Sequence, residues 1–276
     1  MNPTQHPLPP ARTTEPALAG RVAIVFGAGS CAPGWGNGKA TAMTYARAGA
    51  TVIAVDIREE AALETQSLIQ ADGGTCEVAV GDVTSSAQVK TIIDDVAKRH
   101  GRLDVLHNNV GITAMGGVLV ETEESWHHIL DTNLTSAFLT CKHALPHMIA
   151  RGKGAIVNVS SLAAIRYAYP YASYQASKAG LNQLTQSIAI QYASQGIRAN
   201  VIMPGLMDTP LVYQQIAGQY GSVDEMRAAR ASKPPMARQG TAWDIANAAL
   251  FLASDASAYI TGVCLPVDGG LSSVSN

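Results

Sequence analysis

Tyr174 and Lys178 are suited to proton transfer by their residue types and by their spacing of four positions. In a helix, residues four positions apart lie on the same face. A tyrosine hydroxyl has an ordinary pKa of about 10 and is a poor base near neutral pH, but a neighbouring ammonium favours the phenolate. Ser161 stands 13 positions before Tyr174, at the end of an apolar run, where its hydroxyl can hold the same substrate oxygen. These three residues predict a site that takes a proton from a substrate hydroxyl.

A glycine-rich turn at residues 27–38 is suited to bind phosphate, because it joins an apolar run to the start of a predicted helix. Glycines there let the backbone approach a pyrophosphate, whose charge is stabilised by the N–H groups and dipole of the helix start. Asp56 ends the next apolar run, 18 positions after Gly38. An acid at this position accepts hydrogen bonds from both hydroxyls of an adenosine ribose and repels a 2′-phosphate. The pattern predicts a dinucleotide site that prefers NAD to NADP, and we interpret Arg58 as a solvated cation at a helix start.

Polar residues also close the third and fourth apolar runs. Asp82 and Val83 follow the third run. Asn109 and Gly111 follow the fourth. Because ligands of open α/β sheets bind at the carboxyl ends of the strands, we expect these residues to line one crevice. Asn133 adds a polar group to an otherwise apolar helical stretch.

The elements that must position these residues alternate along the chain from residue 21 onward. Short apolar runs predict strands at 22–26, 52–55, 78–80, 103–106, 155–159, 198–203 and 263–267. Segments of helical period predict helices at 38–49, 59–71, 86–99, 123–150, 174–194, 209–230 and 242–253. Strands that are apolar throughout are covered on both faces. We therefore predict one Rossmann-type α/β domain at 20–276, a doubly wound parallel sheet of seven strands with helices on both faces. Residues 1–19, rich in proline, are expected to form a flexible arm.

Composition excludes several classes of protein. Charged residues make up 14% of the 276 residues, against roughly 25% in ordinary domains, which indicates surface buried between subunits. A net charge of −2 without a basic tract argues against a nucleic-acid partner. The N-terminal segment has neither a basic start nor an apolar stretch, so we expect no signal peptide and no membrane span.

The cysteines and histidines do not suggest a metal site. The four cysteines form no CxxC pair, which predicts free thiols and a cytoplasmic location. His143 and His147 have a spacing that helical metal ligands use. Pro146 interrupts it, and neither a carboxylate nor a cysteine joins them. We expect no metal.

Taken together, the motifs resemble the classical subgroup of the short-chain dehydrogenase/reductase family over residues 20 to 272. The resemblance rests on the glycine-rich turn, Asn108-Asn109-Val110-Gly111 in place of the usual Asn-Asn-Ala-Gly, Asn133, Ser161, Tyr174 with Lys178, Pro204-Gly205 followed by Thr209, and Asp268-Gly269-Gly270. It implies that Tyr174 is the general acid/base and that Ser161 orients the substrate oxygen. It also implies that Lys178 binds the nicotinamide ribose and lowers the pKa of Tyr174, and that Asn133 holds a water linking Lys178 to solvent.

The resemblance also implies a set of cofactor-binding residues. They are Gly27, Gly36, Asn37, Gly38, Asp56, Asp82, Val83, Asn109, Gly111, Tyr174, Lys178, Pro204, Gly205, Met207 and Thr209. Eight residues separate Gly27 from Gly36, so the turn carries an insertion of about five residues relative to the family. We align Gly36 and Gly38 with the second and third family glycines, with Gly34 as the rival for the second.

The implied reaction is hydride transfer between NAD and a secondary alcohol or its ketone, in a homotetramer. Ser161, Tyr167, Tyr169 and Tyr174 are expected to contact the substrate, and the tyrosine rings favour a cyclic or aromatic one. Residues 206–235 are expected to cover it without a chemically diagnostic residue. Within the family the alternative is a ketoreductase of the 3-oxoacyl-carrier-protein type. From another class, the alternative is a nucleotide-binding sensor or scaffold without turnover.

Overall fold

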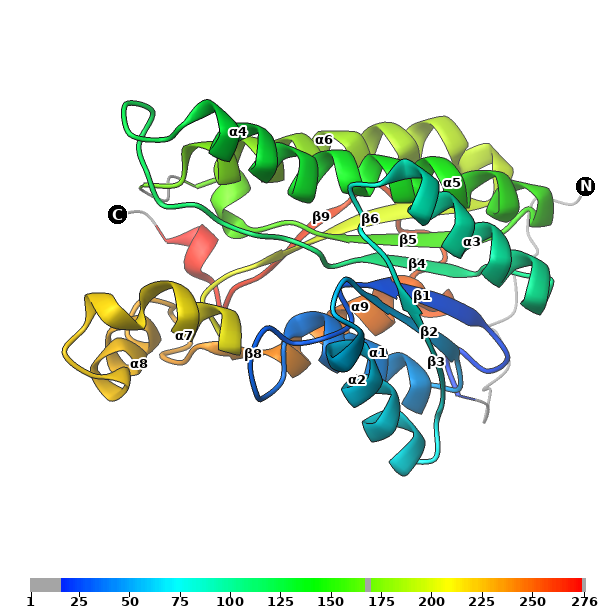
Figure 1. Ribbon diagram of the computed structural model, residues 1–276, viewed down its shortest axis with the longest axis horizontal. Coiled ribbons are helices and arrows are strands. Elements are labelled where there is room, and N and C mark those ends of the chain that lie inside the picture. Colours follow the sequence, from blue (N-terminus) through cyan, green and yellow to red (C-terminus); the bar gives the residue numbers. More distant parts are fainter. Residues whose placement is uncertain (1–15, 167–169, 275–276) are drawn as a thin grey trace, which may run out of the picture.

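The protein is built around one seven-stranded sheet (Figure 1). The structure is a computed structural model and describes residues 16–166 and 170–274, apart from the side chains of residues 215–217. All seven strands run parallel, in the order β3-β2-β1-β4-β5-β6-β9. Their bounds are β1 (Val22–Phe26), β2 (Thr51–Asp56), β3 (Thr75–Val80), β4 (Val105–Asn108), β5 (Gly154–Val159), β6 (Ile197–Pro204) and β9 (Cys264–Val267).

Helices cover both faces of this sheet. They are α1 (Asn37–Arg47), α2 (Glu59–Ala71), α3 (Ser86–His100), α4 (Glu123–Leu130), α5 (Ser136–Arg151), α6 (Ala172–Tyr192), α7 (Pro210–Ile216), α8 (Val223–Ala231) and α9 (Ala242–Ala253). Figure 1 shows α1, α2 and α9 below the sheet and α3 to α6 above it. In β1, Val22, Ile24 and Phe26 belong to one core cluster, whereas Ala23 and Val25 belong to the other. This explains why the strand is apolar throughout, and it confirms the predicted fold.

Local sequence signals fix the helix ends, and α3 is an example. Its N-cap, Ser85, accepts a hydrogen bond from the N–H of Gln88. Val89 and Ile93 lie four positions apart on one face and are buried in the core. The helix ends at Gly101, whose φ of 65° suits glycine.

Two predicted helices are interrupted. The segment predicted at 123–150 contains a π-helical turn, Asp131–Thr135, between α4 and α5. The segment predicted at 209–230 divides into α7, a 3₁₀ turn at Ala217–Gln219 and α8, because the Ser222 side chain caps a new helix by accepting from the N–H of Glu225 at 3.1 Å. Two short paired strands that were not predicted, β7 (Met207–Asp208) and β8 (Gly240–Thr241), flank this segment.

The end of the expected N-terminal arm belongs to the folded domain. Residues 1–15 lie outside the described part of the chain. Leu18 is fully buried, and its N–H donates to the carbonyl of Ala48 at 2.8 Å. Leu18, within the segment expected to be an arm, thus packs into the core, and the domain boundary after residue 19 stays a prediction.

A buried polar network joins the two central strands to two helices. Asn108 on β4 donates through Nδ2 to Oδ1 of Asn158 on β5 at 2.8 Å. Asn158 in turn donates to Oγ1 of Thr185 on α6 at 2.8 Å. Thr140 on α5 donates to Oδ1 of Asn108, also at 2.8 Å. All four side chains are buried, and this network satisfies both side-chain oxygens and nitrogens of the two asparagines.

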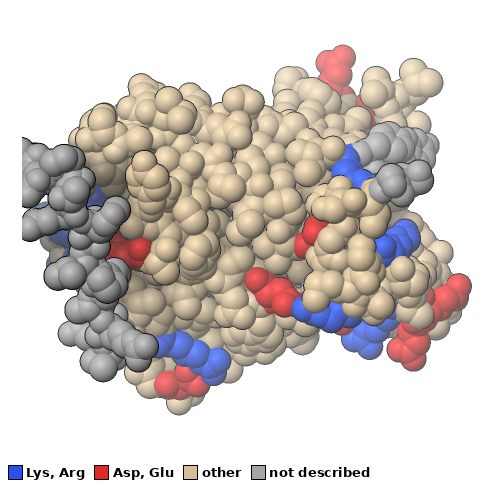
Figure 2. All heavy atoms as spheres, turned by 180° about the vertical axis from the view of Figure 1, so that it is seen from behind, with Lys and Arg blue, Asp and Glu red and all other residues tan. Residues whose placement is uncertain are grey.

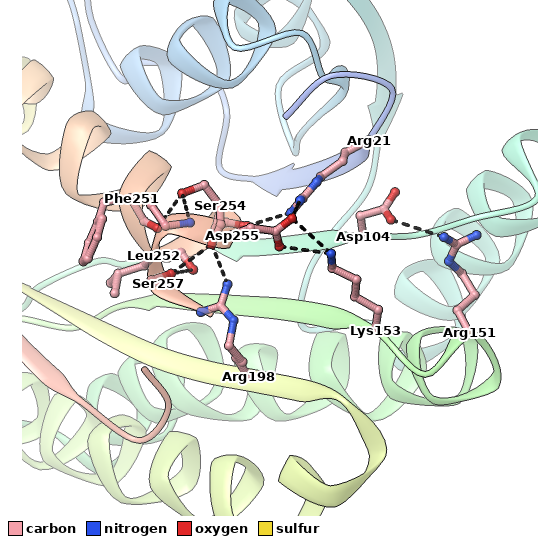
Figure 3. Close-up of polar contacts among 12 residues, drawn as sticks. Arg21, Asp104, Arg151, Lys153, Arg198, Phe251, Leu252, Ser254, Asp255 and Ser257 are labelled. Atoms are coloured by element: carbon pink, nitrogen blue, oxygen red, sulfur yellow. Dashed lines mark hydrogen bonds and ion pairs between the residues drawn. The ribbon is translucent and has the colours of Figure 1, made fainter. Parts of the chain in front are cut away.

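Charged groups gather where the strands begin, as Figure 3 shows. Asp255 forms ion pairs with Arg21 and Lys153, which precede β1 and β5. Asp104, just before β4, accepts from the N–H of Val22 at 2.9 Å and pairs with Arg151 at 3.6 Å. These charges are paired at the amino ends of the strands.

In the described ranges no helix has the length and apolar character needed to cross a membrane.

Candidate active site

A cleft of about 730 Å³ lies at the carboxyl ends of the strands. Of the residues predicted to bind cofactor or to act in catalysis, it is lined by Gly27, Gly36, Asn37, Asp56, Asp82, Val83, Asn109, Gly111, Ser161, Tyr174, Lys178, Pro204, Gly205, Met207 and Thr209. The carboxyl ends of six strands and the segments that follow them, including α6, contribute these residues, so segments far apart in the chain meet here. Asn133 and Gly38 do not line it. Tyr167 and Tyr169 lie outside the described residues.

Tyr174 lies in the first turn of α6, with its hydroxyl beside Ser161. Burial raises the pKa of Tyr174, and a hydrogen bond with the Ser161 side chain offsets part of this effect by stabilising the phenolate. Ser161 follows β5 and also accepts from the N–H of Ala163 at 3.1 Å, which fixes its position. The Tyr171 ring packs edge-on against the Tyr174 ring, with 6.1 Å between centroids. Two hydroxyls therefore converge on one point in the cleft.

Lys178 lies one helical turn after Tyr174, on the same face, as the spacing predicts. Its side chain is buried, and Nζ donates to the carbonyl of Val159 at 2.9 Å. Nζ also lies 5.9 Å from the centroid of the Tyr174 ring. Burial lowers the pKa of Lys178 to about 8. A Cβ at Gly111 would come within 3.0 Å of Nζ, so the absence of a side chain there leaves room for the lysine.

Asn133 lies in the π-helical turn and is buried outside the cleft. Its Nδ2 donates to the carbonyl of Ile112 at 2.9 Å, and its Oδ1 accepts from the N–H of Ile112 at 2.8 Å. Nδ2 also donates to Ser177 Oγ at 3.1 Å. Asn133 therefore ties the segment after β4 to α6, beside Lys178. π turns recur at functional sites, because one extra residue redirects a side chain.

The glycine-rich turn places its glycines in different roles. Gly36 precedes α1 and lines the cleft, whereas Gly34, its rival in the alignment, does not. Gly38 lies beneath the turn, where a Cβ would be 1.9 Å from the carbonyl oxygen of Gly27 and 2.6 Å from Nδ2 of Asn109. Glycine is needed there for close packing of α1 against β1, and a cofactor contact by Gly38 stays a prediction.

The inserted part of this turn is firmly anchored. The Trp35 ring packs against that of Trp243 on α9, with 4.7 Å between centroids. Lys39 is almost fully buried and lies with Nζ 5.3 Å from the centroid of the Trp35 ring. The carbonyl of Cys31 accepts from Nε2 of Gln214 on α7 at 3.2 Å. The insertion therefore connects the start of α1 with the segment that follows β7.

Asp56 and Arg58 line the part of the cleft where β2 ends. Asp56 Oδ2 accepts from the N–H of Gly29 at 2.9 Å, and Oδ1 accepts from the N–H of Arg58 at 3.1 Å. The Arg58 guanidinium donates to the carbonyl of Ser30 at 2.6 Å. Arg58 is exposed at the start of α2, as we interpreted it, and the inserted loop adds a carbonyl contact that the sequence pattern does not reveal.

Arg230 is a site residue that sequence reasoning missed. We expected no diagnostic residue between 206 and 235, yet Arg230 on α8 lines the cleft together with Met207, Leu211 and Val212. No signal in the sequence distinguishes it from an ordinary solvated arginine near a helix end. Only the fold of α7 and α8 over the carboxyl ends of the strands brings it there (Figure 1).

His143, His147 and His107 lie near protein hydroxyl or carboxylate groups. His143 Nε2 lies 3.0 Å from Ser86 Oγ, and His147 Nε2 lies 2.7 Å from Asp94 Oδ1, both on α3. His107 is buried and its Nδ1 lies 3.3 Å from the Tyr45 hydroxyl. Among the described residues no group of three or more His, Cys, Asp or Glu side chains is arranged to hold a metal ion.

Comparison with known proteins gives consistent matches over almost the whole chain. The family model described as Enoyl-(Acyl carrier protein) reductase matches residues 32–272. The chain is 40% identical to cis-4-hydroxycyclohexanecarboxylate dehydrogenase of Sinomonas cyclohexanicum, over 94% of this chain and 99% of that protein. It is 38% identical to the 3-oxoacyl-[acyl-carrier-protein] reductase of Thermotoga maritima, over 92% and 98%. A crystal structure from Burkholderia xenovorans, described as a short-chain dehydrogenase/reductase, superposes with a TM-score of 0.91 at 43% identity and covers 94% of this chain and 99% of that one.

Proposed function

Because the chain belongs to the classical short-chain dehydrogenase/reductase family, we propose that it oxidises a ring-borne secondary alcohol with NAD as the hydride acceptor. The coarser statement follows from its relatives: the protein is an oxidoreductase of hydroxyl-bearing small molecules. The observation that carries the proposal is the meeting of Ser161, Tyr174 and Lys178 in one cleft with the residues suited to a dinucleotide.

The residues of the cleft fit a dinucleotide. The first turn of α1 contains no acidic side chain, so the N–H groups and dipole of its start are free to attract a pyrophosphate. Gly36 and Gly111 present backbone without side chains to the cleft. Asp56 supplies a carboxylate for ribose hydroxyls at the other end. Bound NAD would accept the hydride from the carbinol carbon.

The protein residues would then handle the proton. Ser161 holds the substrate hydroxyl through its own hydroxyl, and Tyr174 as phenolate takes the proton. The ammonium of Lys178 stabilises that phenolate. Asn133 stays in this proposal as a residue that positions the segment after β4 against α6, with its role in proton relay an open prediction.

Replacing Asp56 with alanine should shift cofactor preference toward NADP. The change removes the acceptor for the ribose hydroxyls and the charge that repels a 2′-phosphate, and it leaves Arg58 as the charged group at this end. We expect the ratio of kcat/KM for NAD to that for NADP to fall on the order of tenfold to a hundredfold. Steady-state rates with both cofactors measure it. Wild-type kcat/KM favouring NADP would show that Arg58 and the inserted loop dominate instead.

A cyclic substrate is supported by the apolar side of the cleft and by the relatives. Met207, Leu211 and Val212 line the part of the cleft nearest α7. The Sinomonas relative is named for a hydroxycyclohexane substrate. Tyr167 and Tyr169 remain predicted substrate contacts. A screen of cyclic, aromatic and acyl secondary alcohols, followed through nicotinamide absorbance, tests the proposal, and a best substrate that is short and linear would overturn it.

Two other functions can be separated from this one. The Thermotoga relative favours a 3-oxoacyl ketoreductase, and faster reduction of a 3-oxoacyl thioester with NADPH than oxidation of any ring alcohol would establish it. A sensor or scaffold without turnover is disfavoured, because a lapsed site need not retain Ser161, Tyr174 and Lys178 in contact with one cleft.

We propose that the protein acts as a cytoplasmic homotetramer. Figure 2 shows a broad face with few charged side chains. Phe138 on α5 and Ile190 on α6 are exposed apolar side chains, 46% and 77% accessible. Multi-angle light scattering should therefore give about four times the chain mass of 28.8 kDa. A monomer at micromolar concentration would contradict the assembly.

A further inference from the structure

Arg230 lines the cleft, and no carboxylate of the described chain forms an ion pair with it. It shares this with Arg58 and Lys178, but those two lie at the dinucleotide and proton-transfer parts of the cleft, and the proposed function gives Arg230 no role. Its Nε donates to Oε1 of Gln239 at 2.7 Å, and its Nη2 donates to the carbonyl of Met207 at 3.3 Å. Asp208 is close enough for its negative charge to favour the charged form of Arg230. The Asp208 carboxylate, however, accepts a hydrogen bond from the Tyr213 hydroxyl and lies 3.8 Å from Nε of Arg227. The guanidinium is therefore held in place without having its charge neutralised.

Arg198 is also a partly buried arginine, and its contacts are those of a structural residue. Its guanidinium donates to the carbonyls of Ile260 and Ser254, and it lies near Asp255 at the edge where the strands begin (Figure 3). It does not line the cleft. Arg230 also loses solvent on burial, but part of its surface faces the cleft. Since desolvating an uncompensated cation is costly, an anion bound in the cleft would stabilise it.

The guanidinium retains donors for such an anion. Arginine has five N–H groups in a planar fork, and the two hydrogen bonds to Gln239 and Met207 use two of them. A planar carboxylate matches the fork and carries one negative charge. A phosphate dianion carries two negative charges and would need further cations near Arg230. The electrostatic neighbours of Arg230 are instead Asp208 and tyrosine hydroxyls, including that of Tyr171.

The position of Arg230 relates it to the reacting end of the cleft. Met207, whose carbonyl it contacts, lines the same cleft. Tyr171, an electrostatic neighbour of Arg230, packs its ring against that of Tyr174. We propose that Arg230 binds a carboxylate carried by the substrate, so that the alcohols oxidised are cyclic hydroxy acids whose carboxylate points from the carbinol toward α8. This rests on the proposed oxidation of ring alcohols and names their class.

The test compares a carboxylate with its uncharged carboxamide. The probes are 4-hydroxycyclohexanecarboxylate and 4-hydroxycyclohexanecarboxamide as substrates, and cyclohexanecarboxylate as a ligand that cannot react. In the Arg230→Met variant we expect kcat/KM for the acid to fall on the order of tenfold to a hundredfold, with that for the carboxamide nearly unchanged. Arg230→Lys should recover part of the loss. Arg238→Met is the matched control and should keep the wild-type preference for the acid, because Arg238 is exposed, lies outside the cleft and pairs with Asp244 rather than with Asp208.

Calorimetry on the NAD-loaded enzyme tests the inference without turnover. Cyclohexanecarboxylate should bind the wild type, and its Kd should rise at least tenfold in Arg230→Met. Failure to bind the wild type, or equal Kd values in the two proteins, would overturn the inference. So would a rise in the Kd of NAD itself, which would make Arg230 a cofactor contact. Tight binding of the carboxylate without oxidation of any ring alcohol would support Arg230 as the anchor and refute the proposed function.

Discussion

Tyr174→Phe should lower kcat for alcohol oxidation on the order of a thousandfold while leaving the affinity for NAD nearly unchanged. Phenylalanine keeps the ring and its edge-on contact with Tyr171, so the packing at the start of α6 is preserved. The variant loses only the hydroxyl that we propose takes the substrate proton. Steady-state rates by nicotinamide absorbance measure kcat, and calorimetry measures the affinity for NAD.

Tyr171→Phe is the matched control for this variant. Tyr171 lies beside Tyr174 but does not line the cleft, so removal of its hydroxyl should change kcat less than threefold or so. Near-normal turnover by Tyr174→Phe would refute the assignment of Tyr174 as the base. An equal loss in both variants would instead indicate disturbed packing of the two rings.

Lys178→Met should reduce kcat on the order of a hundredfold or more, weaken NAD binding and change the pH profile. Tyr174 acts as a base only as phenolate, so the rate of oxidation rises with pH. The Lys178 ammonium favours the phenolate, so its loss should raise the pKa of Tyr174 and move that rise to higher pH. In the wild type, burial lowers the pKa of Lys178 to about 8, so above that pH its support for the phenolate declines.

Ser161→Ala separates the two roles assigned to Lys178. It removes the hydrogen bond that favours the Tyr174 phenolate, so the profile should again move to higher pH, but the affinity for NAD should not change. Rates from pH 6 to 10 or so, with NAD binding measured in parallel, distinguish the variants. An unchanged pH profile in Lys178→Met would show that the ammonium does not tune Tyr174.

The sheet and most helices were predictable because their signals are local or periodic. The strands are short apolar runs, and α2 and α9 were predicted with the bounds that the structure has. The π turn at Asp131–Thr135 was not predicted, since one extra residue in a helical turn leaves no mark on a pattern of apolar positions. The division between α7 and α8 depends on a single N-cap at Ser222. It was not predicted, because the apolar positions on both sides of Ser222 fit one continuous helical period.

Residues that line the cleft were predictable where residue type and strand end coincide, as for Asp56 and Ser161. Arg230 was not, because an arginine acquires a functional position only when a distant helix folds over the cleft. The family resemblance implies site roles for Gly38 and Asn133, which stay predictions. The packing of Gly38 under the turn and the hydrogen bonds of Asn133 to Ile112 depend on the fold and could not be predicted. The Ser30 carbonyl that binds Arg58 belongs to an insertion, which follows no family pattern.

The buried network of Asn108, Asn158, Thr140 and Thr185 has a consequence for how uniquely the chain folds. Neighbouring strands that are apolar throughout can slide past one another by a residue with little change in buried apolar area. A slip between β4 and β5 would separate Asn108 from Asn158, and each buried polar group left without a partner costs about 1–3 kcal/mol. The penalty selects one alignment of the strands from several that hydrophobicity alone would accept. Since Ser161 follows β5 and Thr185 shares α6 with Tyr174 and Lys178, the same selection sets the mutual alignment of the three residues that we propose act on the substrate.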